Sequence, residues 1–380
     1  MNENILTEPI SRREMMKRTA IVAGALALLP TLSACEDGMN VETLAQQLRQ
    51  DGTVSSANVQ DYLVELVRMA SLAASGHNMQ PWIFEIGQDE ISILPDYSRR
   101  LPVVDPQDRE LWMSLGCAFE NLVIAARAMG YAVQESMEVD GDERLTIRFS
   151  DGSEAADTAL AAMIPQRQCH RGLYNMKFVS NSEMALLNTA SELSMAKAIF
   201  VRDGTDVKTL QLLVMEGDVQ QYADDAFVNE LVESLRFNER EALETRDGLF
   251  SACSGNAKVP RFIGKMFVKP GMGDSQAEND RQLIDSASGL LLISSAGDSK
   301  ADWISAGRVY QRTALQMTGM GIAHSFLNQP IEVPALREQV KTFLAAQTSE
   351  ATTPQLLVRY GYADESMPYS LRRGVDEIVK

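Results

Sequence analysis

The chain has 380 residues, with 52 acidic and 35 basic side chains and a formal net charge of −17. A protein this acidic repels nucleic acid and anionic membrane surfaces, so we expect no nucleic-acid partner. Its four cysteines have no metal-ligand spacing and indicate neither a metal site nor a disulfide framework. The length allows two domains, or one large domain with two cores.

The first 34 residues are typical of an export signal. Residues 11–17, Ser-Arg-Arg-Glu-Met-Met-Lys, resemble the twin-arginine consensus, and the apolar run that follows, residues 20–32, is too short to span a bilayer. Residues 32–35, Leu-Ser-Ala-Cys, resemble a lipobox, in which Cys35 is lipidated and becomes the mature N-terminus. The alternative is a generic basic leader with an incidental cysteine. The first interpretation predicts a protein exported in the folded state, on the periplasmic side of the membrane, and attached to it only through the lipid.

Helical and strand patterns alternate along the rest of the chain and predict an α+β fold with a central sheet and long packed helices. Apolar, β-branched runs between breakers predict strands at 82–86, 91–94, 145–149, 198–202, 289–294 and 355–360. Helical periodicity predicts helices at 40–50, 58–73, 107–130, 154–165, 181–192, 206–245, 276–287, 301–321 and 334–346.

An internal repeat indicates two related halves, which we place at residues 35–155 and 156–380. The repeat has an offset of 191 residues, which relates Ser114, Gly116, Phe119, Met129 and Gly130 to Ser305, Gly307, Tyr310, Met320 and Gly321. Chance similarity between two amphipathic helices is the alternative. The second half is longer, and residues 216–285 lack the alternating strand and helix patterns of the flanking segments. We interpret that segment as an inserted lid over a pocket, or else as a surface excursion without a role.

A small-residue loop, Ala-Ala-Ser-Gly-His-Asn-Met-Gln-Pro-Trp at residues 73–82, stands between a predicted helix and a strand. Its small residues let backbone N–H groups approach a ligand, and Asn78 and Gln80 carry donors and acceptors suited to the polar edge of a flavin ring. An ordinary turn explains the same residues. The order closely resembles the A-P-S-x-x-N-x-Q-P-W signature of nitroreductase-like FMN proteins, with Ala74 in place of proline. The resemblance implies that Ser75, Asn78 and Gln80 bind FMN.

A basic cluster in the second half, Arg167-Gln-Cys169-His170-Arg171, places two arginines four residues apart. Guanidinium groups bind phosphate oxygens in a bidentate manner, so the cluster suits a phosphate monoester, although a solvated basic turn is the alternative. The spacing resembles the R-x-T-x-R motif of the Acg-type branch of the same family, whose members are fused pseudo-dimers with a lid. The resemblance implies that Arg167, Cys169, His170 and Arg171 contact FMN.

Two further segments carry the resemblance. Residues 355–373 resemble the closing strand and Arg-Arg tail of that branch, which implies that Arg372 and Arg373 contribute to the phosphate site. The segment Pro330-Ile331-Glu332 resembles the loop that passes beside the flavin N5, with Val333 where many relatives have glycine. The loop at 73–82 occurs only in the first half, and the cluster and this segment only in the second. The resemblance therefore implies a nitroreductase-like fold, with two halves fused around mixed, largely antiparallel sheets, and a monomer with one FMN.

These features predict an exported, lipid-anchored FMN oxidoreductase that reduces a small nitro, quinone or similar electrophile. The isoalloxazine ring carries the redox chemistry, so we expect no catalytic residue of the protein itself. NAD(P)H should be scarce outside the cytoplasm, which leaves the electron donor unknown. The competing hypothesis is a non-catalytic protein that sequesters FMN under its lid. A third hypothesis is a structural lipoprotein without flavin.

Overall fold

The computed structural model describes residues 40–50, 61–150, 156–190, 196–348 and 352–380. The predicted export signal and Cys35 lie outside this part of the chain. In the first half, strands β1 (Trp82–Ile86), β2 (Glu90–Pro95), β4 (Arg144–Ser150) and β3 (Ala132–Glu138) form an antiparallel sheet in that order.

The second half repeats this sheet. Strands β5 (Ala196–Val201), β8 (Gly289–Ser295), β10 (Thr353–Gly361) and β9 (Ala323–Phe326) are antiparallel in the order β5-β8-β10-β9. In both halves a long helix connects the second strand to an edge strand: α4 (Arg109–Ala128) leads to β3, and α12 (Lys300–Gly319) leads to β9. The predicted α+β fold with two related halves around largely antiparallel sheets is confirmed.

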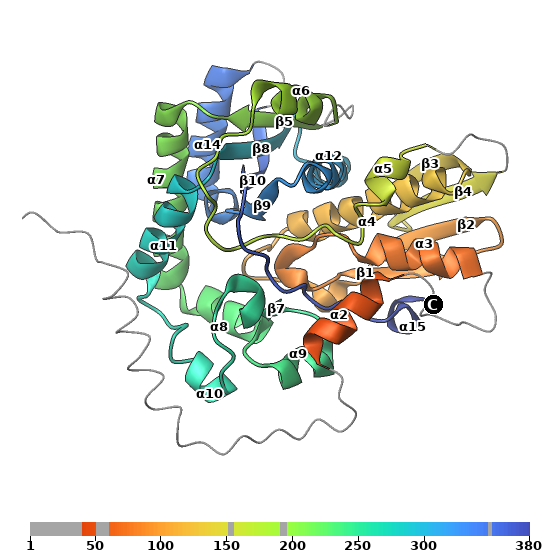
Figure 1. Ribbon diagram of the computed structural model, residues 1–380, viewed down its shortest axis with the longest axis horizontal. Coiled ribbons are helices and arrows are strands. Elements are labelled where there is room, and N and C mark those ends of the chain that lie inside the picture. The colour runs from red at the N-terminus through yellow and green to blue at the C-terminus, as the bar shows by residue number, and fades with distance from the viewer. Residues whose placement is uncertain (1–39, 51–60, 151–155, 191–195, 349–351) are drawn as a thin grey trace, which may run out of the picture. The chain divides into compact units, whose positions relative to one another are not determined.

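Helices α4 and α12 cross at two glycines that the internal repeat relates to each other (Figure 1). A Cβ atom on Gly116 would lie 2.2 Å from the carbonyl oxygen of Ile304, and one on Gly307 would lie 2.0 Å from that of Met113. Met113 and Ile304 have the same offset of 191 residues as the two glycines. The crossing is therefore a pseudo-twofold contact between equivalent positions of the two halves.

The same offset extends past the ends of the two helices. Gly130 and Gly321 follow α4 and α12 with left-handed φ values of 87° and 70°. Only glycine adopts such φ values readily, and a glycine in this conformation commonly ends a helix. Strands β3 and β9 then begin at Ala132 and Ala323. The repeated residues thus specify both the helix crossing and the turn into the edge strand.

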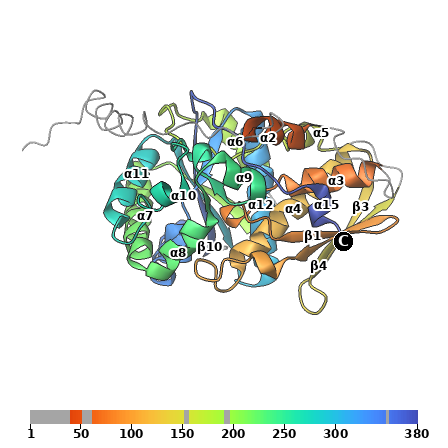
Figure 2. The same cartoon turned by 90° about the horizontal axis from the view of Figure 1, so that it is seen from below.

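The halves differ most in one connection. Three residues join β1 to β2, whereas residues 202–288 join β5 to β8. This long connection, hereafter the insertion, contains α7 (Gly204–Ala223), α8 (Asp225–Ser234), β6 (Leu235–Arg236), α9 (Glu239–Thr245), β7 (Leu249–Phe250), α10 (Arg261–Gly264) and α11 (Gly273–Asp285). Strands β6 and β7 form a short parallel pair. Helices α7 and α11 lie together on the side away from β3 and β4 (Figures 1 and 2).

The structure differs from the predicted elements at several places. The helix expected at 154–165 is reduced to the four residues of α5 (Thr158–Ala161), and the short strands β6 and β7 were not predicted. The single helix expected at 206–245 is three helices, because Asp224 and Asn238 leave the helical conformation and accept hydrogen bonds as the N-caps of α8 and α9. Strand β3 was missed because polar side chains dominate this exposed edge strand, and β9 because it has only four residues.

The remaining helices are α2 (Val41–Arg49), α3 (Asp61–Ser71), α5 (Thr158–Ala161), α6 (Asn181–Ala190), α13 (Gln329–Glu332), α14 (Pro334–Gln347) and α15 (Val375–Ile378). The C-terminal tail crosses to the first half, where the backbone of Lys380 donates a hydrogen bond to Phe84 in β1. In the part of the chain described, no helix is both long and apolar enough to cross a membrane.

Candidate functional site

The loop between α3 and β1 has a strained backbone. His77, Asn78 and Gln80 have φ values of 44°, 57° and 54°, in the left-handed region that favours glycine. Such residues cost about 1 to 3 kcal/mol each and persist only where the surroundings hold them. The Oγ of Ser75 accepts a hydrogen bond from the backbone of Gln80 at 3.0 Å, and the backbone of Gly76 donates to Ser114 Oγ at 3.2 Å. These hydrogen bonds hold the loop in its strained conformation.

The two amides of the loop bind other parts of the protein. Gln80 is fully buried; its Oε1 accepts from the backbone of Arg373 at 2.8 Å, and its Nε2 donates to the carbonyl oxygen of Arg246 at 2.9 Å. Asn78 Nδ2 donates to the carbonyl oxygen of Gly248 at 3.1 Å, and its Oδ1 accepts from Arg372 Nη1 at 2.8 Å. These side chains join the loop to the insertion and to the C-terminal tail. Their direct contact with a flavin stays a prediction.

Arg167 and Arg372 come together beside this loop from distant parts of the chain. They are 2% and 4% exposed, and both donate to the carbonyl oxygen of Leu72, at 3.1 and 3.4 Å. Neither has a carboxylate partner among the residues described here. Nε and Nη1 of Arg167 and Nε of Arg372 are buried without any hydrogen-bond partner. The structure thus joins two of the predicted phosphate ligands in one positive site that no carboxylate of the described residues neutralises.

The other predicted basic residues lie around this pair. Arg171 is half-buried and approaches Ser254 of the insertion, with 3.5 Å between Nη1 and Oγ. Arg373 donates to the carbonyl oxygen of Gln80 at 3.2 Å. His170 Nε2 lies 2.7 Å from the carbonyl oxygen of Glu365, while its Nδ1 is buried without a partner.

Cys169 has an unusually acidic thiol. Its Sγ lies 3.7 Å from the hydroxyl of Tyr310. Burial raises the pKa of the thiol, but the neighbouring His324 and the positive charges of Arg167 and Arg171 outweigh burial and lower the pKa to about 6. A thiolate here partly balances the arginines.

A carboxylic acid lies on the other side of the loop. A Cβ atom on Gly76 would lie 3.1 Å from Glu110 Oε2, and Glu110 Oε1 accepts from Asn328 Nδ2 at 3.1 Å. Burial and the neighbouring Glu332 raise the pKa of Glu110 to about 8. Burial and the charge of Glu110 raise the pKa of Asp105 to about 7. At neutral pH this end of the loop therefore holds protonated carboxyl groups.

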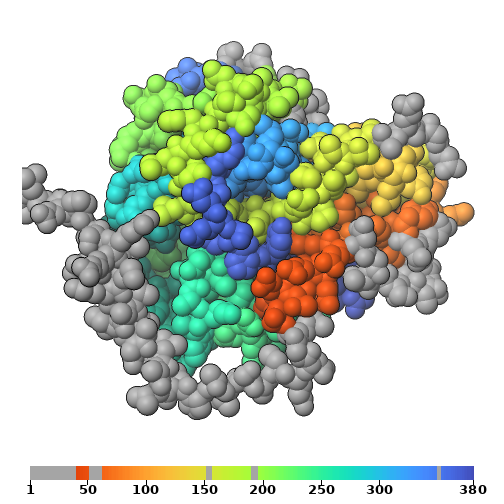
Figure 3. Space-filling view, in the orientation of Figure 1, coloured from red at the N-terminus to blue at the C-terminus, as the bar shows by residue number. Residues whose placement is uncertain are grey.

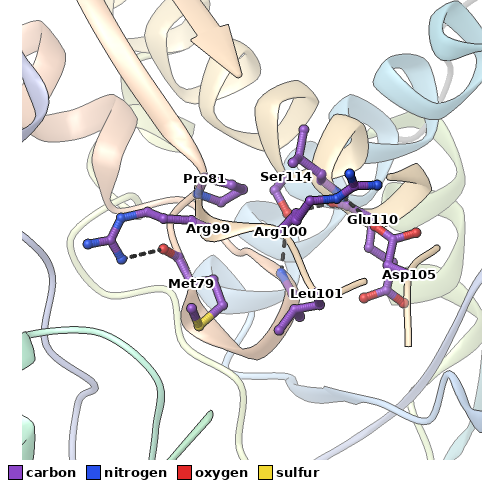
Figure 4. Close-up of a pocket in the computed structure, with 10 residues that line it drawn as sticks. Met79, Pro81, Arg99, Arg100, Leu101, Asp105, Glu110 and Ser114 are labelled. Carbon is purple, nitrogen blue, oxygen red and sulfur yellow. Dashed lines mark hydrogen bonds between the residues drawn. The ribbon is translucent and has the colours of Figure 1, made fainter. Parts of the chain in front are cut away.

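These acids border a small cavity of about 10 Å³, in which the carboxyl groups of Asp105 and Glu110 lie next to each other (Figure 4). Arg99 lies at its rim and donates to the carbonyl oxygen of Met79 at 3.1 Å. The cavity is large enough for about one water molecule and is far smaller than a flavin.

The predicted segment Pro330-Ile331-Glu332 forms α13 at this acidic end. The backbone N–H groups of Ile331 and Glu332 both donate to the carbonyl oxygen of Asn328, at 2.7 and 2.9 Å. Glu332 Oε2 accepts from Gln221 Nε2 of the insertion at 2.5 Å. The structure thus brings the four segments predicted to bind FMN close to one another around this loop, with the arginines at one end and α13 at the other. The sequence does not single out Glu110, because an acidic residue in the first turn of a helix is common.

Comparison with known proteins gives relatives over most of the chain. No family model matches it. A Mycobacterium tuberculosis H37Rv protein named "Putative NAD(P)H nitroreductase Rv3131" is 24% identical over 323 residues, which cover 83% of this chain and 90% of that protein. The H37Rv protein named "Putative NAD(P)H nitroreductase acg" is 24% identical over 340 residues, with 84% and 95% covered. The chain is a distant homologue of these two proteins. The resemblance to the Acg-type nitroreductases is thereby supported.

Solved structures give weaker matches. The FMN-dependent nitroreductase NfnB of Mycobacterium smegmatis, in complex with NADPH, is 15% identical with a TM-score of 0.40 and covers 59% of this chain and 97% of its own. A nitroreductase with bound FMN from Bacteroides fragilis is 12% identical with a TM-score of 0.31, with 55% and 89% covered. At this level of similarity, the fold assignment depends on the strand order described above.

Proposed function

We propose that the protein is an FMN-dependent oxidoreductase that binds one FMN per chain at the interface of its two halves. The FMN phosphate would lie at Arg167 and Arg372, and the flavin ring would follow the loop of residues 75–80 towards α13. The observation that carries this proposal is the pair of buried guanidinium groups, at one end of the loop, that have no carboxylate partner in the described structure and keep unbonded N–H groups. The names of the mycobacterial relatives support the reaction class.

The arginines fit the phosphate of FMN by their chemistry. Burying a charge without a partner is costly, and a protein with a net charge of −17 has ample carboxylates that could have filled the position. Arg167 and Arg372 instead present unbonded N–H groups. A phosphate monoester carries close to two negative charges and accepts several such bonds. Bound FMN would supply the hydride and electron transfer.

At the other end, the chain can hold a proton close to the proposed ring position. With its pKa raised to about 8, Glu110 is mostly protonated at neutral pH, and its Oε2 faces Gly76. Reduction of a nitro group or quinone consumes protons as well as electrons. Glu110 is therefore placed to store a proton at Oε2 while Asn328 fixes the orientation of the carboxyl group.

The insertion supports a second candidate, in which the protein holds FMN without turnover. Backbone carbonyl groups of Arg246 and Gly248 accept hydrogen bonds from Gln80 and Asn78, so the insertion covers the loop. Phe250 of the insertion packs in a small core with Leu371 of the tail. A cover of this kind excludes water, and an enzyme would need it to open during each turnover.

We further propose that the protein is exported in the folded state by the twin-arginine route and anchored through Cys35 outside the cytoplasmic membrane. A small nitro or quinone compound would be the substrate and a still unidentified donor the source of electrons. Mass spectrometry of the mature N-terminus tests the anchor. An unprocessed leader, or a Cys35 without lipid, would contradict it.

The test of the function is the purified protein from a host with twin-arginine export. We expect a flavin absorption spectrum, and release of FMN on denaturation. Anaerobic reduction followed by addition of nitro and quinone compounds separates the two candidates. An oxidoreductase reoxidises with these compounds at a rate that depends on their concentration. A storage protein keeps its flavin reduced, or resists reduction altogether.

A further inference from the structure

Arg49, the last residue of α2, adds a third buried guanidinium without a carboxylate partner to the pair formed by Arg167 and Arg372. It is 6% exposed. Its Nη1 donates to the carbonyl oxygens of Pro165, at 2.7 Å, and Arg167, at 3.3 Å, while its Nε and Nη2 are buried without a partner. Its guanidinium stacks on the ring of Tyr369 at 4.1 Å. In the described structure it makes no ion pair.

The three arginines repel one another. Burial, followed by the charge of Arg167, lowers the pKa of Arg49 to about 9. Burial, followed by the charges of Arg49 and Arg167, lowers the pKa of Arg372. A guanidinium still carries its charge at neutral pH, so the repulsion and desolvation destabilise the fold until an anion arrives. Arg68, a neighbour of Arg49, differs in this respect because it forms an ion pair with Glu65.

A purely structural role accounts for only part of these contacts. Arg49 could serve to bind the carbonyl oxygen of Pro165 and thereby fix α2. One Nη group is enough for that purpose, and Nε and Nη2 would remain orphaned in the interior, which native proteins rarely tolerate. The unbonded groups of Arg49, Arg167 and Arg372 together form the donor set of an oxyanion with two charges.

We propose that Arg49 is a phosphate-binding residue, and that a phosphate monoester bound by Arg49, Arg167 and Arg372 fastens helix α2 to the body of the protein. The inference rests on the proposed function only for the identity of that monoester as FMN. No motif of the sequence pointed to Arg49, which precedes the loop at residues 73–82 and every other segment that resembles the nitroreductase-like family.

The packing of α2 shows which parts of the protein a bound phosphate would hold together. Val41, Leu44 and Ala45 pack with Ala242 and Phe250 of the insertion and Leu371 of the tail. Figure 3 shows α2 in red, the insertion in teal and the C-terminal stretch in dark blue side by side on one face. The phosphate would neutralise the charge that opposes this packing. Cofactor binding and docking of α2 therefore stabilise each other, since coupling between two equilibria is reciprocal.

The first experiment compares the affinity of the full-length apoprotein for FMN and for riboflavin, which lacks the phosphate, by flavin fluorescence. For Arg49→Gln we expect FMN to bind about 10- to 100-fold more weakly, the equivalent of one charged hydrogen-bonding partner, and riboflavin to bind as in the parent. Arg49→Lys should recover part of the loss, because the charge remains and the fork is lost. Arg148→Gln, which removes an exposed and paired arginine of β4, should leave the FMN affinity within about threefold.

The second experiment measures hydrogen exchange of residues 41–49 with and without inorganic phosphate or FMN. Each ligand should slow exchange in the parent protein and have no such effect in Arg49→Gln. The inference would be overturned if Arg49→Gln lost FMN and riboflavin affinity equally. It would also be overturned if phosphate did not change the hydrogen-exchange rate of α2 in the parent protein. If Arg49→Gln does not fold, the flavin affinities of Arg49→Lys and hydrogen exchange in the parent protein still test the inference.

The two proposals can fail separately. Phosphate binding that depends on Arg49, in a protein that binds no flavin, would refute the proposed function and leave the anion site standing. Tight FMN binding that is indifferent to Arg49 would refute the inference alone.

Discussion

The pseudo-twofold crossing of α4 and α12 makes a quantitative prediction about Gly116→Ala and Gly307→Ala. A new Cβ would lie 2.2 or 2.0 Å from a backbone carbonyl oxygen of the facing helix, closer than any real contact. The facing group is backbone and cannot rotate away, so the helices must separate. We expect each substitution to lower the free energy of unfolding by about 3 kcal/mol, the upper end of the usual cost of overpacking, although alanine itself favours a helix by about 1 kcal/mol.

Urea unfolding followed by circular dichroism measures these losses. Gly319→Ala is the matched control, because it lies in α12 and its Cβ would meet only Met163 atoms at 3.4 Å and beyond. This variant should be neutral or slightly stabilised. The double variant should lose less than the sum of the two single losses, since one separation of the helices relieves both clashes. Wild-type stability in both single variants would refute the close crossing, and a large loss in only one would refute its symmetry.

Three further predictions concern the site. Arg167→Ala and Arg171→Ala should weaken FMN binding by about 2 to 4 kcal/mol in a flavin titration, with partial recovery in the lysine variants; unchanged affinity in both would show that these arginines do not bind the phosphate. Glu110→Gln should flatten the pH dependence of stability: the folded pKa of about 8 lies above the ordinary 4.5, so the parent has this contribution in full below pH 4.5 and loses it as the pH rises through 8. The slope removed should be at most about 1.4 kcal/mol per pH unit in urea unfolding, and an identical slope in the variant would contradict the buried acid. Gln80→Leu should cost about 2 to 4 kcal/mol in the same assay, because it leaves the partners of a buried amide unsatisfied, and a loss below 1 kcal/mol would show that the loop does not depend on it.

Part of this fold can be read from local sequence patterns. The six predicted strands are apolar runs that the two sheets bury, so their pattern reflects the environment that they occupy. Strand β3 lies at a sheet edge with polar side chains on it, and nothing in its pattern distinguishes it from a loop. Asp224 and Asn238 act as N-caps, yet each could equally lie on the surface of one long helix.

The candidate site likewise contains residues that the sequence predicts and residues that it does not. Its motifs are contiguous, and the resemblance that they carry located the loop, the arginines and α13. Arg49 and Glu110 belong to the site through contacts across 118 and 218 residues of sequence, to the backbone of Arg167 and to Asn328. No local pattern encodes such contacts. The hydrogen bonds that join Asn78 and Gln80 to the insertion and the tail also connect distant parts of the chain, so the sequence does not predict them.

The central claim is that the two halves together bind one FMN through its phosphate. The most direct measurement is the amount and identity of the flavin released when a known quantity of the folded protein, saturated with FMN and freed of excess, is denatured. We expect one FMN per chain, and much weaker retention of riboflavin under the same conditions. A protein that retains no flavin, two flavins per chain, or retention of riboflavin equal to that of FMN would contradict the account.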